Sequence, residues 1–186
     1  MSCLLSGKRY RLLESVFDSI MRDDRQIRII FVCHGNICRS PMAEYIFKYL
    51  AQQAGVADRF EVSSAAVSTE EIGNDIYPPA KLKLREHGIP YARHAAHQLT
   101  REEYEYYDKV ICADIDNLTY LPRIAHVEYD DIMDYFDTDE KASLMMQWAG
   151  LRRDVSDPWY TRNFEAAYRD IYAACEAILK FYTQTN

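Results

Sequence analysis

Short apolar runs alternate with amphipathic stretches along most of the chain. Residues 28–32, 61–65 and 109–113 are compact apolar runs that predict buried strands, and residues 126–129 predict a fourth. Apolar side chains recur at helical spacing between and after these runs, most clearly over residues 164–182. Strands that alternate with helices favour βαβ units and a parallel sheet, which is an α/β fold.

Proline, glycine and capping residues indicate where several of the expected helices begin and end. One helix opens with Pro78 and Pro79 and closes at Gly88. Thr100 and Glu103 have the spacing of a capping box, in which each residue's side chain bonds the other's backbone. This pair predicts the start of a second, shorter helix.

Two other stretches have weaker patterns. Over residues 114–121 we expect a loop and a short helix, which Pro122 should stop because proline lacks the N–H that a helix interior needs. Residues 130–156 are first acidic and then basic. There we expect a loop with one helical piece around residues 142–148.

The first 26 residues stand apart from the alternation of strands and helices. Their apolar side chains recur at helical spacing with charged residues between them, so we expect an amphipathic helix packed on the main domain. Mixed charges on its polar face argue against a membrane-surface helix. No repeat or linker marks a second domain. The predicted organisation is an N-terminal amphipathic extension, residues 1–26, and a single domain, residues 27–186. The apolar positions of the extension are Leu12, Leu13, Val16, Phe17, Ile20 and Met21.

Composition and charge narrow the range of functions. The chain has 186 residues, enough for one domain with a core, and a formal net charge of −7. This charge does not favour nucleic acid as a partner, although a local site can still bind an anion. No apolar run approaches the roughly 20 residues that span a bilayer, so we expect no membrane insertion. Five cysteines without dense spacing argue against a secreted disulfide scaffold and favour a reducing cytoplasm.

The candidate chemistry is concentrated in the loop after the first predicted strand. Five residues separate Cys33 from Arg39, and a helical pattern begins at Pro41 with Ser40 as its expected N-cap. A loop of this size can curl so that its backbone N–H groups point at one centre and hold a tetrahedral oxyanion such as phosphate. The location suits a ligand site, because ligands of parallel sheets bind beyond the carboxyl ends of the strands.

Cys33 is the candidate nucleophile, since the thiolate is the form of cysteine that attacks. Arg39, the N–H groups from His34 to Ser40 and the positive end of the following helix would stabilise the thiolate. The Ser40 hydroxyl could add a hydrogen bond to the sulfur. Arg39 would bind two phosphoryl oxygens through its planar fork. Gly35 would allow a backbone conformation that a β-carbon forbids.

Phosphoester cleavage also needs a proton donor, because an alkoxide or phenoxide is a poor leaving group. Asp157 is the candidate acid. Pro158 restricts it to an extended conformation, which places its carboxyl group on a loop. Trp159 and Tyr160 could form a wall for an aromatic leaving group.

The two motifs together resemble those of the low-molecular-weight protein tyrosine phosphatases. Cys-x-Gly-Asn-x-Cys-Arg-Ser-Pro followed by Met-Ala-Glu matches that family at residues 33–44, and Asp-Pro-aromatic-Tyr precedes the last helix. The resemblance covers residues 27–182. It implies a three-layer sandwich, with a four-stranded parallel sheet flanked by helices, to which this chain adds an N-terminal helix. It also implies hydrolysis in two steps without metal or cofactor. Cys33 would take the phosphoryl group while Asp157 protonates the leaving oxygen, and Asp157 would then activate water.

The resemblance implies roles for residues around the loop. Asn36 would hold the loop's shape with support from His94, and Ser64 falls where a supporting serine is found. Cys38 matches a second cysteine that can form a reversible disulfide with the nucleophile. Glu70, followed by a second glutamate, falls where many relatives carry an aromatic residue against the substrate ring. Two carboxylates there would repel an acidic phosphopeptide.

The expected substrate is a phosphotyrosine protein or a small aryl or alkyl phosphate. Related protein arginine phosphatases tend to carry threonine where Ile37 stands, whereas an aliphatic side chain leaves room for a flat ring and favours phosphotyrosine. Thiol-dependent arsenate reductases share the fold and loop but need two further cysteines as a disulfide relay. Cys112 and Cys175 are interpreted as core residues instead. A non-catalytic phosphate-binding module would need the loop but not the acid, and the loop offers too few ligands for a closed metal site.

Overall fold

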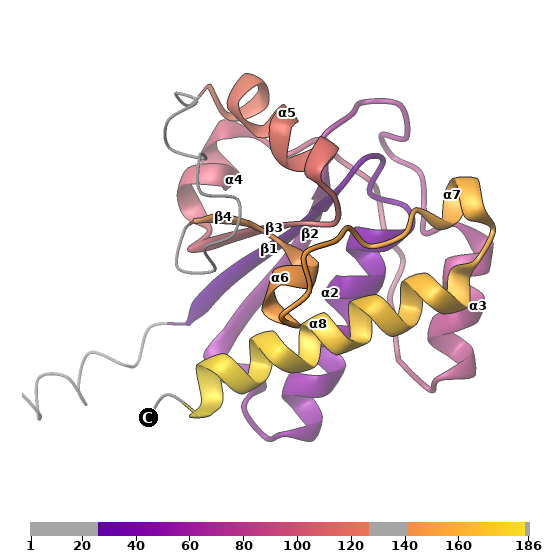
Figure 1. Cartoon of the computed structure of the whole chain (residues 1–186), viewed down its shortest axis with the longest axis vertical. Coiled ribbons are helices and arrows are strands. Elements are labelled where there is room, and N and C mark those ends of the chain that lie inside the picture. Colours follow the sequence, from indigo (N-terminus) through magenta and orange to yellow (C-terminus); the bar gives the residue numbers. More distant parts are fainter. Residues whose placement is uncertain (1–25, 127–140, 185–186) are drawn as a thin grey trace, which may run out of the picture.

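The molecule is built around a four-stranded parallel sheet in the order β2-β1-β3-β4 (Figure 1). The structure is a computed structural model that describes residues 26–126 and 141–184. The predicted α/β fold with a parallel sheet is confirmed, while residues 1–25 of the predicted extension lie outside the described part. The strands are β1 (Ile27–Cys33), β2 (Phe60–Ala66), β3 (Lys109–Cys112) and β4 (Ala142–Leu144).

Helices cover both faces of the sheet, which gives the expected three layers (Figure 1). The long helices α2 (Arg39–Gln53) and α8 (Phe164–Gln184) pack against each other on one face. No helix in the described part of the chain combines the length and apolar character that crossing a membrane requires. The other face carries α4 (Arg101–Tyr106) and α5 (Ile115–Ala125), and the remaining short elements are η1 (Ala57–Arg59), α3 (Pro78–Glu86), α6 (Met145–Trp148) and α7 (Pro158–Thr161).

Strand β1 is apolar throughout its centre because it is buried on both faces. Ile29 and Phe31 belong to the core on the side of α2 and α8. Ile30 and Val32 belong to the core on the side of α4 and α5. A central parallel strand covered by helices on both sides needs such an uninterrupted apolar run. The burial of β1 therefore fixes Cys33, its last residue, at the carboxyl edge of the sheet.

The fourth strand differs in position from the prediction. We expected a strand at residues 126–129 and a helical piece at 142–148. His126 instead ends α5 in the left-handed conformation, and residues 127–129 lie outside the described part. The strand is β4, three buried residues paired with β3, and only Met145–Trp148 is helical. Three residues are too few to show the two-residue period of a strand.

The prediction that Pro122 stops a helix is wrong. Helix α5 continues past this residue to Ala125. Proline removes one backbone N–H bond, but Leu121 and Ala125 are fully buried on either side of it. Packing of these apolar side chains outweighs the local cost of the proline.

The predicted capping box at the start of α4 is confirmed. The Glu103 N–H donates to Thr100 Oγ1 at 3.1 Å, and the Thr100 N–H donates to Glu103 Oε2 at 3.0 Å. Glu103 also contacts His97 Nε2 at 2.9 Å through its other carboxylate oxygen. That hydrogen bond raises the pKa of His97. The capping box therefore links α4 to the segment that precedes it.

Replacing Thr100 should destabilise the protein by a measurable amount. Thr100→Ala removes the N-cap acceptor and should lower the free energy of unfolding by about 1 kcal/mol. Thr100→Ser keeps the hydroxyl and should stay close to wild type. Urea unfolding at constant m-value measures both variants. Equal stability of the alanine variant and wild type would contradict the capping assignment.

Candidate active site

The candidate loop joins the end of β1 to the start of α2. Cys33 is the last residue of the strand and is buried, and residues 34–38 form the loop. Helix α2 begins at Arg39, two residues before the predicted Pro41. Ser40 is therefore not the N-cap that we expected. Cys38 has that position, and its side chain makes no capping bond.

The backbone of the loop is turned so that its carbonyl groups face outward. The carbonyl oxygens of Cys33, His34 and Ile37 accept N–H groups from the segment after β2, at 2.9, 3.0 and 2.8 Å. The N–H groups of residues 34–38 donate to no oxygen in the described part of the chain. A peptide whose carbonyl is tied outward directs its N–H the other way. These amides therefore form an anion-binding concavity of the kind known as a nest.

Asn36 gives the loop its shape. Its φ of 57° is a left-handed conformation, which asparagine tolerates better than most residues, and its side chain is fully buried. His94 Nε2 lies 2.8 Å from the Asn36 carbonyl oxygen and 3.0 Å from its Oδ1. Both are acceptors, so His94 donates from Nε2. The Asn36 Nδ2 group donates in the opposite direction, to Ser40 Oγ at 2.9 Å and Ser64 Oγ at 3.0 Å.

The Ser40 hydroxyl connects this network to the candidate nucleophile. Its Oγ lies 3.1 Å from Cys33 Sγ and 3.2 Å from the carbonyl oxygen of Ala65. Since Asn36 already donates to this oxygen, the single hydroxyl proton is free for the sulfur or the carbonyl. A thiolate would attract the proton more strongly than a neutral carbonyl does. Ser40 is the second residue of α2, after the N-cap Cys38, and its hydroxyl lies between the sulfur and the Ala65 carbonyl.

Glu44 lies at the end of the network away from Cys33. Its role there was not predicted from the sequence motif. Ser64 Oγ donates to Glu44 Oε2 at 2.6 Å, and Lys48 Nζ donates to Oε1 at 2.5 Å. The Glu44 residue is buried, so its carboxylate needs these partners. Because Ser64 donates to Glu44, its oxygen remains an acceptor for Asn36.

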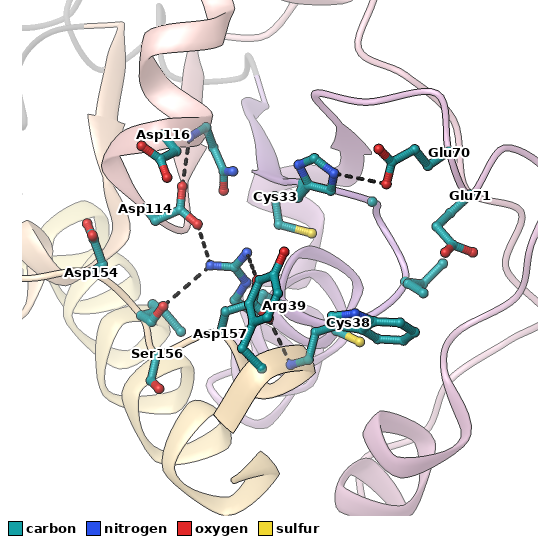
Figure 2. Close-up of a pocket in the computed structure, with 17 residues that line it drawn as sticks. Cys33, Cys38, Arg39, Glu70, Glu71, Asp114, Asp116, Asp154, Ser156 and Asp157 are labelled. Carbon is teal, nitrogen blue, oxygen red and sulfur yellow. Dashed lines mark hydrogen bonds and ion pairs between the residues drawn. The ribbon is translucent and has the colours of Figure 1, made fainter. Parts of the chain in front are cut away.

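Arg39 is the charged centre of the pocket (Figure 2). Only 2% of the residue is exposed. Its Nη1 donates to Asp114 Oδ2 at 2.5 Å, and its Nη2 donates to Asp157 Oδ2 at 2.6 Å. Burial lowers the pKa of Arg39, but the neighbouring charges of Cys33, Asp114 and Asp157 raise it above the usual value. The guanidinium therefore keeps its positive charge despite its burial.

Asp157, the candidate acid, lines the same pocket as Cys33. It is the N-cap of α7, with an extended backbone as the following proline predicts. Oδ1 accepts the Trp159 N–H at 2.9 Å, and Oδ2 accepts from Arg39. The acid and the guanidinium are thus in direct contact, within the same pocket as Cys33.

The pocket has a volume of about 420 Å³ and is lined by most of the predicted residues. Trp159 and Tyr160 form one wall, and their exposed fractions are 41% and 83%. Across the pocket, His34 Nε2 lies 3.2 Å from Glu70 Oε2. The predicted residues that line it are Cys33, His34, Gly35, Ile37, Cys38, Arg39, Glu70, Asp157, Trp159 and Tyr160, while Asn36, Ser40, Ser64 and His94 form the network behind the loop.

The reason for glycine at position 35 differs from our expectation. The positive φ of the loop belongs to Asn36, not to Gly35. A β-carbon at Gly35 would lie 3.1 Å from Glu71 Cγ. Gly35 therefore allows the segment that carries Glu71 to approach the loop closely.

The other described cysteines are buried thiols without a disulfide. Burial raises the pKa of Cys38, Cys112 and Cys175 well above the usual value. Cys112 and Cys175 lie in the two separate cores, on opposite faces of the sheet. In the described residues, no group of three or more histidine, cysteine or acidic side chains is arranged to hold a metal ion.

Several pocket residues were not predicted. Asp114, Asp116 and Asn117 come from the start of α5, and Asp154 comes from the loop before α7. One signal was available for the first three. They follow β3, which lies beside β1, and the carboxyl ends of neighbouring parallel strands share one edge of the sheet. Asp154 carried no comparable signal, because the path of the chain through residues 130–156 was ambiguous.

Sequence comparisons relate the chain to one family. A family model described as low molecular weight phosphotyrosine protein phosphatase matches residues 28–185. The low molecular weight protein-tyrosine-phosphatase YfkJ of Bacillus subtilis is 33% identical over 159 residues, which cover 82% of this chain and 94% of that protein. The low molecular weight phosphotyrosine protein phosphatase of Rattus norvegicus is 31% identical over 159 residues, covering 82% and 93%.

Solved structures agree with the sequence comparisons. The crystal structure of YfkJ from Bacillus subtilis superposes with a TM-score of 0.75 at 30% identity, covering 87% of this chain and 98% of that one. The crystal structure of DARP, a Drosophila arginine phosphatase, superposes with a TM-score of 0.73 at 26% identity, covering 85% and 99%.

Two substitutions of Asn36 separate its backbone conformation from its side-chain contacts. Asn36→Gly and Asn36→Ala both remove the amide bonds, so both should weaken binding of inorganic phosphate in calorimetric titration. Asn36→Ala should also be less stable than Asn36→Gly by about 1 kcal/mol, because a β-carbon disfavours positive φ. Equal urea-unfolding stability of the two variants would contradict the backbone argument. Wild-type phosphate affinity in both would contradict the role of the network.

Proposed function

The chain belongs to the low molecular weight phosphotyrosine protein phosphatase family, and from this premise we propose that it hydrolyses phosphotyrosine in proteins. We also propose that it acts through a cysteinyl-phosphate intermediate on Cys33. Arg39 binds the phosphoryl group and Asp157 serves as general acid and base. Small aryl and alkyl phosphates are further substrates of the same site.

One observation carries this proposal: the candidate nucleophile, an anion-binding backbone, a buried guanidinium and an acid meet in one pocket. The N–H groups of residues 34–38, which donate to no oxygen among the described residues, are available to hold the three phosphoryl oxygens. Arg39 would supply two further donors. A phosphate-binding module would need these donors but would not need Asp157 in contact with Arg39.

The reaction begins when the phosphoester displaces carboxylate oxygens from Arg39. Asp157 then turns toward the ester oxygen and carries a proton. The Cys33 thiolate forms a bond to phosphorus as the bond to the ester oxygen breaks, and Asp157 gives its proton to that oxygen. In the second step Asp157 removes a proton from water, whose oxygen attacks phosphorus and releases phosphate and the thiolate. Ser40 stabilises the thiolate at the start and at the end through its 3.1 Å contact.

The shape of the pocket favours an aromatic phosphoester. Ile37 lines it with an aliphatic side chain, and Trp159 and Tyr160 form a wall against which a phenol ring can stack. The likeness to a Drosophila arginine phosphatase makes phosphoarginine the competing substrate. Ile37 has no hydroxyl to hydrogen-bond a phosphorylated guanidinium, so we favour phosphotyrosine.

Arsenate reduction is the alternative that the cysteines argue against. A reductase would pass a disulfide from Cys33 to other thiols. Cys112 and Cys175 are fully buried on opposite faces of the sheet, and burial raises the pKa of both. Their complete burial argues against a role as relay thiols. Cys38 also lines the pocket, and we propose that a reversible Cys33–Cys38 disulfide protects the nucleophile under oxidation.

We also propose an organisation and a location for the protein. We propose that residues 27–186 form one phosphatase domain and residues 1–26 an amphipathic extension. The free thiols of the described cysteines suit a reducing cytoplasm. The net charge of −7 makes nucleic acid an unsuitable partner.

Cys33→Ser should abolish hydrolysis of p-nitrophenyl phosphate and keep binding of inorganic phosphate, because serine preserves the loop but is not a nucleophile here. Cys175→Ala, which removes a buried thiol outside the pocket, is the control and should keep turnover. Steady-state assays and calorimetric titration measure the two properties. Substantial hydrolysis by the serine variant would refute the nucleophile assignment.

Asp157→Ala should slow hydrolysis by about 10²–10⁴-fold, the usual scale of general acid catalysis. The loss should be larger for phenyl phosphate than for p-nitrophenyl phosphate, because the poorer leaving group depends more on protonation. Comparison of kcat for the two substrates tests this. An equal loss for both would mean that Asp157 acts on the fold of the pocket and not on the leaving group.

A further inference from the structure

One side of the pocket carries carboxylates that the proposed reaction does not use. Figure 2 shows Asp114, Asp116 and Asp154 together on the side of the pocket opposite Glu70. Asp114 is bound to Arg39. Asp116 and Asp154 form no ion pair with any residue that the structure describes.

A backbone bond holds one of these two carboxylates, and the other projects from the start of a helix. Asp116 is exposed in the first turn of α5. Asp154 Oδ1 accepts the Ile115 N–H at 3.0 Å, which ties the loop before α7 to the same helix end. Burial and the charges of Asp114 and Asp116 raise the pKa of Asp154. The carboxylates are thus close enough to repel one another, and a cation between them would relieve the repulsion.

Asn117 provides a second and independent observation. Only 2% of this residue is exposed, yet it lines the same pocket. Its Oδ1 is buried and has no hydrogen-bond partner in the described protein. Buried acceptors of this kind are rare because they lose water without replacing it. Among the described residues no hydrogen bond engages this oxygen, so it is available to accept a donor from a ligand.

These groups form a wall of acceptors, which suits a ligand rich in N–H donors. The positive end of α5 is offset by its N-cap, Asp114. No metal-ligating group of three or more side chains exists among the described residues, so an organic cation is the better match. Arginine and lysine side chains are donors without acceptors.

Resting on the proposed function, we propose that Asp116, Asn117 and Asp154 form a subsite for a basic side chain of the protein substrate. The phosphotyrosine enters between Trp159 and the loop, and an arginine or lysine near it in the sequence reaches the acidic side. The negative phosphate and the positive side chain of the substrate would then match the charges of the pocket. Arg39 binds the phosphate, and the subsite binds the cation. Acidic phosphopeptides would be poor substrates.

The test uses phosphotyrosine peptides that carry one arginine at each position up to two residues from the phosphotyrosine. Matched peptides replace the arginine with citrulline, which has the same shape without the charge. For wild type we expect kcat/KM to be about tenfold higher for the best arginine peptide than for its citrulline partner, the scale of a charge-assisted hydrogen bond. Asp116→Asn with Asp154→Asn should reduce this ratio to near one. Asp58→Asn, which removes an exposed charge at the opposite end of β2, should keep it.

Asn117→Leu tests the buried amide, because leucine has a similar shape and removes an unpaired acceptor. It should lower the arginine-to-citrulline ratio while its urea-unfolding stability stays equal to wild type or rises. If the variant is stable and its arginine-to-citrulline ratio of kcat/KM is unchanged, Asn117 is not part of the subsite.

The outcomes separate this proposal from the proposed function. Equal kcat/KM for arginine and citrulline peptides in wild type, with p-nitrophenyl phosphate still hydrolysed, overturns the subsite alone. Failure of wild type to hydrolyse any of the phosphoesters overturns the phosphatase function. A ratio that survives in the double aspartate variant also overturns the subsite.

Discussion

The left-handed backbone at Asn36 is the constraint on which the rest of the pocket depends. It turns the chain between β1 and α2, where the carbonyl groups of Cys33, His34 and Ile37 are tied to the segment after β2 and the N–H groups that follow them point the other way. Such a turn is held only if the surroundings determine it, and here both ends of the Asn36 amide are bound. His94 binds the oxygen, and the hydroxyls of Ser40 and Ser64 accept from the nitrogen. The loop is therefore shaped before any ligand arrives, which reduces the cost of binding an anion.

The second constraint is that Arg39 joins parts of the chain that are far apart in sequence. Its guanidinium bridges Asp114, 75 residues away, and Asp157, 118 residues away. Each carboxylate also caps a helix through its other oxygen, Asp114 at α5 and Asp157 at α7. The fold thus brings Asp157, the proposed acid, into the pocket of Cys33, the proposed nucleophile, through one buried charge. Losing that charge would leave two carboxylates in the pocket without their shared cation.

The features predicted from sequence are those that depend on local patterns. The loop at residues 33–40, the candidate acid Asp157 and the capping box at Thr100 can each be recognised from a few neighbouring residues. The nearly continuous apolar run at residues 28–32 predicted β1. Family resemblance added Asn36, His94 and Ser64, which no local rule connects.

What could not be predicted depends on tertiary contacts. β4 has three residues and is a strand only because β3 pairs with it. Pro122 stays inside α5 because its neighbours are buried. Asp154 enters the pocket through a bond to the Ile115 backbone, and Gly35 is required by Glu71 from another loop. The spacing of residues in the sequence does not reveal such contacts between distant segments.

The most direct test of the account is to find where the phosphoryl group resides during turnover. In Asp157→Ala the second step lacks its base, so the intermediate should accumulate. Acid quenching of that variant during hydrolysis of p-nitrophenyl phosphate, followed by mass spectrometry of its peptides, should locate the phosphoryl group on Cys33. The proposed mechanism would be contradicted by a phosphoryl group on another residue. It would also be contradicted if wild type turned over without any trapped intermediate in rapid-quench experiments.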